Sequence, residues 1–239
     1  MNPMIETFGA LVGKAAAKSP DRARRLLEAA FYASNFQAKH FPSRKLTTAR
    51  AFISPVCMDA VLHPLAHPER SAIVNLFLPC EILHAMRIEP QIAEGLSCYF
   101  SGAGSEQYFI EYARQKGVPD TLCSYHKILT GIALSGVLPK PRLIANTTLA
   151  CDANTNTFRR IAAHYGVPHF TVDTPCADDA DAVQYVADQL RGSPASLRKP
   201  CTSVSARMPF GPCSLASSAL CRPAGATTTC WPTGICPMR

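Results

Sequence analysis

Two cysteines, Cys123 and Cys151, each stand directly before a segment that is expected to form a helix. Cys151 follows the apolar run of residues 141–148, and Asp152 comes directly after it. Because the free amides at the start of a helix favour a thiolate, either cysteine could hold a metal or act as a nucleophile. The alternative is a small buried thiol that only fills space in a core, which is the usual place of a free cysteine.

The elements around these cysteines alternate between strand and helix from about residue 71 to residue 192. We expect strands at residues 71–79, 91–97, 141–148 and 168–175, and helices at residues 80–88, 104–117, 123–136, 153–166 and 178–192. This order predicts an α/β fold with a Rossmann-like parallel sheet flanked by helices. Because ligands bind beyond the carboxyl ends of such strands, we expect both cysteines at one rim of the sheet.

Two further regions flank this α/β domain of residues 71–192. Residues 1–70 predict a helical N-terminal segment with a break at Ser19-Pro20, and residues 193–239 predict an irregular tail. The tail has no Asp or Glu, seven prolines and five of the 11 cysteines: Cys201, Cys213, Cys221, Cys230 and Cys236. Since it lacks His and any C-x-x-C pair, a disordered or aberrant, frame-shifted end is favoured over a zinc module.

Charge and hydropathy exclude several classes of protein. The net charge is +7, but residues 1–192 carry 19 basic and 17 acidic side chains, so the expected fold is nearly neutral and we expect no nucleic-acid partner. No apolar run reaches the roughly 18 residues of a membrane span, so we expect no membrane partner. The N-terminus lacks the features of a signal peptide, which predicts a cytoplasmic protein.

Paired thiolates suit iron or zinc, and their spacing does not choose between zinc and an iron–sulfur cluster. His126 is a candidate ligand or proton donor, although a packed or solvated histidine is favoured at that position. Cys80 ends an expected strand and is a weaker candidate thiol. Three other cysteines before the tail have less favourable settings: Cys57, Cys98 and Cys176.

Three stretches of the chain carry a family resemblance. "LPCEILHAMRI" at residues 78–88, "LCSYHKILTGIAL" at residues 122–134 and "IANTTLACDANTNTFRRIAAHYGVPHFTVDTP" at residues 144–175 together resemble the 2-hydroxyacyl-CoA dehydratase D-component family. This family is similar to the benzoyl-CoA reductase subunits. The resemblance covers about residues 50–192 and rests on the combination of the three stretches.

The resemblance implies two Rossmann-like domains with a helical N-terminal part, and a [4Fe–4S] cluster held by three cysteines with one open iron. Cys123 and Cys151 would be two of these ligands. The third normally comes from a second domain, whereas this chain departs from the family pattern at about residue 193 and looks truncated. Glu81 matches a family glutamate and would line the site, and Thr147 and Thr148 could donate hydrogen bonds there or serve simple turn chemistry.

The implied activity is the removal of water from a 2-hydroxyacyl-CoA. An ATP-hydrolysing activator protein would deliver one electron through the cluster to the thioester carbonyl, and the resulting ketyl radical anion would expel hydroxide. The implied partners are a related subunit in a heterodimer, the activator and the acyl-CoA substrate. Two alternatives remain open: an acyl-CoA reductase subunit of the benzoyl-CoA type, and a non-catalytic, truncated α/β domain.

Overall fold

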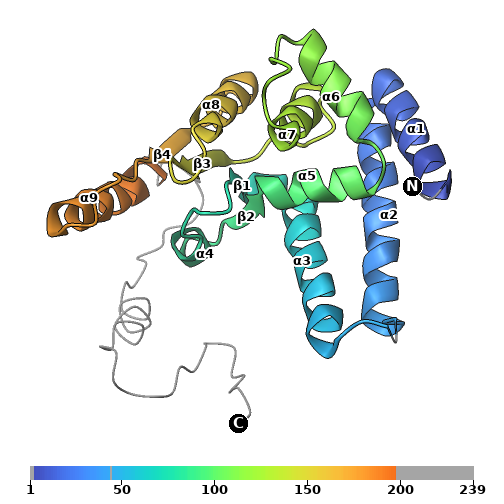
Figure 1. Ribbon diagram of the computed structural model, residues 1–239, viewed down its shortest axis with the longest axis horizontal. Helices are drawn as coiled ribbons and strands as arrows, with labels where there is room; N and C mark the ends of the chain where they lie inside the picture. Colours follow the sequence, from blue (N-terminus) through green and yellow to red (C-terminus); the bar gives the residue numbers. More distant parts are fainter. Residues whose placement is uncertain (1–2, 44, 198–239) are drawn as a thin grey trace. The chain divides into compact units, whose positions relative to one another are not determined.

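The computed structural model describes residues 3–43 and 45–197, with side chains through residue 192, all within one compact unit (Figure 1). The helices are α1 (Pro3–Lys18), α2 (Pro20–His40), α3 (Thr48–Ala66), α4 (Glu81–Ala85), α5 (Ala93–Gly102), α6 (Glu106–Gln115), α7 (Ser124–Leu134), α8 (Ala153–Tyr165) and α9 (Ala180–Leu197), with a 3-10 turn η1 (Pro68–Arg70). The strands are β1 (Ser71–Val74), β2 (Glu89–Ile92), β3 (Leu143–Thr147) and β4 (His169–Val172).

The strands form one parallel sheet in the order β2-β1-β3-β4. The two central strands, β1 and β3, are buried along their whole length, as expected where helices cover both faces of a parallel sheet. The predicted α/β fold with a Rossmann-like parallel sheet and a helical N-terminal region is therefore confirmed.

The two faces of the sheet pack into separate cores. Ala72 and Val74 of β1 point into the smaller core with Leu83 of α4 and the partly buried Val186 of α9. Ile73 points the other way, into the larger core, which also holds Phe158 of α8. The helices that follow β1 and β3, α4 and α8, thus cover opposite faces.

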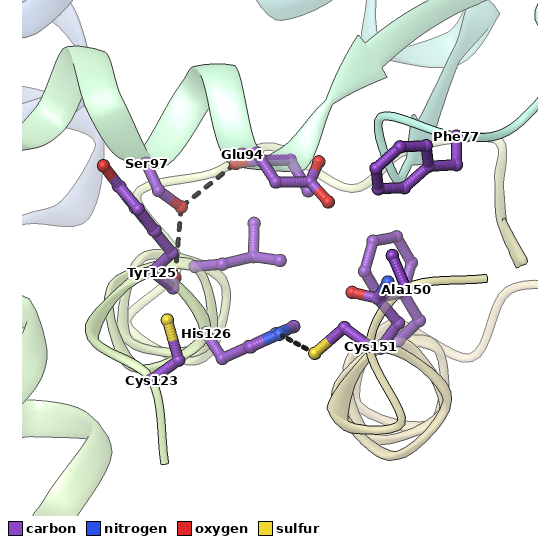
Figure 2. A pocket seen from close by; sticks show the side chains of 12 residues that line it. Phe77, Glu94, Ser97, Cys123, Tyr125, His126, Ala150 and Cys151 are labelled. Carbon is purple, nitrogen blue, oxygen red and sulfur yellow. Dashed lines mark hydrogen bonds between the residues drawn. The ribbon is translucent and has the colours of Figure 1, made fainter. Parts of the chain in front are cut away.

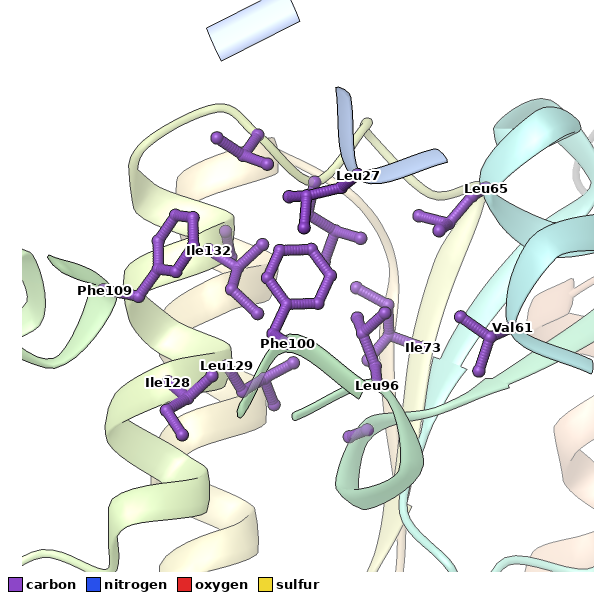
Figure 3. Close-up of a cluster of buried hydrophobic side chains, with 14 of the residues drawn as sticks. Leu27, Val61, Leu65, Ile73, Leu96, Phe100, Phe109, Ile128, Leu129 and Ile132 are labelled. Atoms are coloured by element: carbon purple, nitrogen blue, oxygen red, sulfur yellow. The ribbon is translucent and has the colours of Figure 1, made fainter. Parts of the chain in front are cut away.

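The N-terminal helices belong to the larger core rather than to a separate body. Leu27 of α2 and Leu65 of α3 pack there with Phe100 of α5 (Figure 3). The ring of Phe100 meets those of Phe31 and Phe109 edge-on, with centroids 6.0 and 5.5 Å apart. Such aromatic pairs contribute about 0.5–1.5 kcal/mol beyond the burial of their area, so they help to fix α5 between α2 and α6.

Two of the expected elements are placed differently. The segment at residues 71–79 is a strand only as far as Val74, because the side chain of Asn75 bonds to β3 instead of continuing the strand. The strand expected at residues 91–97 is wrong beyond Ile92. Residues 93–102 form α5, because Leu96 and Phe100 are buried at helical spacing.

In the part of the chain that the structure describes, no helix is long and apolar enough to cross a bilayer. The predicted irregular tail and its five cysteines lie outside the described residues, except that the backbone of α9 continues to Leu197. The predicted division of the chain at residues 70 and 192 stays a prediction.

Candidate functional site

A crevice is expected between β1 and β3, because the chain leaves these neighbouring strands in opposite directions. It passes from β1 through α4 to β2 on one side, and from β3 through α8 to β4 on the other. In open parallel sheets, ligands bind at such a switch point, outside the carboxyl ends of the strands.

A cavity of about 250 Å³ lies at this place. Four segments line it: the loop after β1, the start of α5, the start of α7, and the loop after β3 with the start of α8 (Figure 2). The lining residues are Phe77, Ala93, Glu94, Ser97, Cys123, Tyr125, His126, Leu129, Ala150, Cys151, Asn154 and Phe158. Each segment follows or adjoins a carboxyl end of the sheet or a helix start, so the fold itself assembles the site.

The structure brings Cys123 and Cys151 to this one cavity, although they are far apart in the sequence. Cys123 is the residue before α7, is exposed and has an extended backbone with ψ 139°. Cys151 is half-buried and lies just before α8. Both thiols are thus at helix starts, where backbone amides favour negative charge. Their role as metal ligands stays a prediction.

His126 lies beside these thiols. Its Nε2 atom is 3.5 Å from Sγ of Cys151, and the ring lies between the two cysteines in the view of Figure 2. Burial lowers the pKa of His126 below its ordinary 6.5, so the imidazole is neutral at neutral pH. The sequence analysis favoured a packed or solvated histidine at this position. His126 is packed, since it is only 9% exposed, and its ring also lines the cavity.

Glu94 is a lining residue that the sequence analysis did not identify. It stands in the first turn of α5, and its Oε2 accepts a hydrogen bond of 3.0 Å from the N–H of Leu76. Burial raises the pKa of Glu94, so its carboxyl holds a proton to higher pH than a solvated one. The signal that could have identified Glu94 is the helical spacing of Leu96 and Phe100. This spacing predicts a helix after Ile92, with Glu94 in its first turn beside the edge of the sheet.

Asn154 is a second missed residue. It is 2% exposed and lines the cavity, yet its side chain makes no hydrogen bond to any other described residue. No side-chain cap bond forms at the start of α8, where the backbone N–H of Asn154 donates to the Cys151 carbonyl. An amide in a cavity wall can donate a hydrogen bond to a polar ligand or accept one from it.

The residue before Cys151 has an unusual backbone. Ala150 has φ 71°, in the left-handed region that costs a residue with a side chain about 1–2 kcal/mol. This turn lies directly before Cys151 and α8.

Hydrogen bonds between loops hold the carboxyl edge together. The side chain of Asn75 donates to Oγ1 of Thr147 and accepts from its N–H, both at 3.0 Å, and so joins the end of β1 to β3. The Thr148 hydroxyl donates to Asp173 at 3.0 Å and accepts from the N–H of Thr174. Both threonines therefore serve the turns, and neither lines the cavity.

The other predicted residues lie outside the cavity wall. Glu81 is exposed at the first position of α4. Cys80 packs against the smaller core, where its thiol donates to the Leu78 carbonyl, and burial raises its pKa. Three further cysteines of the described ranges are exposed and do not line the cavity: Cys57, Cys98 and Cys176.

The site combines three kinds of group: soft thiol ligands, a neutral imidazole and a carboxyl with a raised pKa. Thiols are the ligands that iron–sulfur clusters prefer, and a protonated carboxyl can deliver a proton. No three His, Cys, Asp or Glu side chains in the described ranges gather closely enough to hold a metal ion without further ligands.

A comparison with protein families gives one match. The sequence model described as 2-hydroxyglutaryl-CoA dehydratase, D-component, matches residues 75–202, more than half of the chain. All the cavity-lining residues fall in this range. The match begins later than the expected residue 50 and continues past the expected limit of residue 192. No curated protein matches the sequence.

Proposed function

The chain belongs to the 2-hydroxyglutaryl-CoA dehydratase D-component family, and on that premise we propose that it is a subunit of an iron–sulfur 2-hydroxyacyl-CoA dehydratase. One observation carries the proposal: Cys123 and Cys151 line one cavity at the carboxyl edge of the sheet, within the residues that match the family. Its partners would be a related subunit and an ATP-dependent activator protein.

The donor set fits a [4Fe–4S] cluster in part. Cys123 and Cys151 would supply two thiolates, and the unpartnered amide of Asn154 offers a hydrogen bond to a ligand in the cavity. A further ligand would come from outside the described residues. When bound, the cluster supplies single-electron transfer to the thioester carbonyl, which weakens the bond to the neighbouring hydroxyl.

The protein's own groups would manage protons and water. We assign Glu94 as the proton donor to the departing hydroxide, since burial keeps its carboxyl protonated to higher pH. The carboxylate left behind takes the proton that the next carbon of the acyl chain loses. The 2-hydroxyacyl-CoA becomes a 2-enoyl-CoA and water, the single electron is returned, and Glu94 ends the cycle protonated.

The test is an anaerobic assay of the reconstituted protein with its partner subunit, activator, ATP, a reductant and 2-hydroxyglutaryl-CoA. We expect the 2-enoyl-CoA to form with only catalytic amounts of reductant consumed. A product with two added hydrogens and stoichiometric consumption of reductant would favour the acyl-CoA reductase. Absence of turnover in a protein that also binds no iron would favour a non-catalytic domain.

A further inference from the structure

A second cavity, of about 580 Å³, lies between α1 and α2, away from the cysteine site. Its lining residues are Leu11, Lys14, Ala15 and Lys18 from α1, and Arg22, Arg25 and Leu26 from α2. The two helices pair after the break at Ser19-Pro20 (Figure 1), which brings the last turns of α1 against the first turns of α2.

No acidic side chain lines this cavity to balance its four cations. No salt bridge in the described part of the chain involves Lys14, Lys18, Arg22 or Arg25. Arg25 does lie close enough to Glu28 for its charge to oppose, in part, the burial that raises the pKa of that carboxyl. Arg24, on another face of α2, contrasts with them, since it pairs with Asp21 at 2.6 Å.

No undescribed side chain can supply the missing negative charge either. Residues 1, 2, 44 and 193–239 include no Asp or Glu. Four like charges gathered around one hollow create a positive potential there, which attracts an external anion.

We propose that the α1–α2 cavity binds a small polyanion that carries two or more phosphate groups. Lysines offer point charges and arginines offer planar forks that match phosphate oxygens, and four such groups exceed what one single-charged anion needs. The apolar side chains of Leu11 and Leu26 would contact the non-phosphate part of the ligand. The proposal does not depend on the chemistry at Cys123 and Cys151.

Calorimetric titration of the full chain with inorganic pyrophosphate and tripolyphosphate tests this site. We expect saturable binding that weakens as salt is raised, because the cations are exposed and screened. The double variant Arg22→Gln/Arg25→Gln should bind roughly tenfold more weakly, the loss expected for two exposed ion pairs.

The matched control is Arg50→Gln/Lys140→Gln, which removes the same charge from exposed positions outside the cavity. Equal affinity of the two double variants would overturn the proposal, as would the absence of binding to every phosphate compound. Vesicles of phosphatidylcholine with and without phosphatidic acid separate a lipid phosphate from a free one. Binding only to the acidic vesicles, lost in Arg22→Gln/Arg25→Gln but kept in the control, would assign the site to a lipid headgroup.

Discussion

Glu94 is a carboxyl whose partly buried setting differs from that of a solvated side chain. It lies at the start of α5 with one carboxyl oxygen bound to the Leu76 amide, and the group lines the same cavity as both thiols. Burial is the main cause of its raised pKa, and the Leu76 hydrogen bond opposes that shift only in part. A carboxyl in this state holds its proton to higher pH than a solvated one, which suits a group that gives and regains a proton.

Replacing Glu94 by Gln keeps the shape of the side chain and an oxygen for the Leu76 N–H, but removes the acidic proton of the carboxyl group. We expect dehydratase turnover to fall about 10²–10⁴-fold, the usual contribution of a positioned acid or base, with iron content unchanged. The matched control is Glu111→Gln, an exposed position on α6 outside the cavity. Turnover of Glu94→Gln within about twofold of the control would remove Glu94 from the proton transfer.

At the scale of elements, α7 matters most because it carries Cys123 and His126 at its start. Its middle approaches α6 very closely: a Cβ atom added at Gly131 would overlap the carbonyl group of Phe109. Only a glycine allows this contact, so the position of α7 depends on it.

Gly131→Ala should therefore lower the free energy of unfolding by about 1–3 kcal/mol, the cost of an overpacked contact. Gly95→Ala in α5 is the control, since its nearest neighbour would be Ile92 at an ordinary 3.9 Å. That change should raise stability by about 0.5–1 kcal/mol, because alanine is the better helix former. Denaturant unfolding of both variants measures the difference, and equal stabilities would show that α6 and α7 are less closely packed.

Regular periodicity made most elements predictable. The helices after Cys123 and Asp152 and the strand at residues 141–148 have one dominant pattern, and the structure confirms them. The secondary structure after Ile92 could not be assigned from the sequence, because a short strand passes into a helix without a turn residue between them. Periodicity over such a short run does not separate the two states.

The site could be predicted only in outline. Cys123 and Cys151 stand out because a helix start beside a strand end is visible in the sequence. Glu94 and Asn154 do not, since their place in the cavity wall depends on how α5 and α8 pack, which is tertiary information. Glu81 matched a family motif, but its exposed place on α4 follows from the short loop after β1.

For the whole molecule, a partly buried histidine couples stability to pH. His169 in β4 lies with its Nε2 2.8 Å from Oδ1 of Asn146, and burial, aided by the nearby charge of Arg159, lowers its pKa below the ordinary 6.5. Below pH 6.5 the unfolded chain therefore takes up a proton that the folded protein does not. The contribution of His169 to the free energy of unfolding is therefore fully present above pH 6.5 and is lost as the pH falls below that value.

His169→Gln retains a donor for Asn146 but does not titrate. We expect its free energy of unfolding to depend less on pH between pH 7 and pH 5 than that of the wild type. His126 is unchanged in this variant. His67→Gln, at an exposed position, is the matched control. Parallel stability curves for His169→Gln and wild type would mean that His169 titrates alike in both states.

The central claim is that Cys123 and Cys151 together hold an iron–sulfur cluster at the rim of the sheet. The most direct test is the iron and sulfide content per chain after anaerobic reconstitution of the wild type, Cys123→Ser, Cys151→Ser and the exposed-cysteine control Cys57→Ser. We predict that the wild type and Cys57→Ser bind equal amounts, and that each of the other two variants loses most of its iron while keeping its circular dichroism. Wild-type iron and sulfide in both Cys123→Ser and Cys151→Ser would contradict the account.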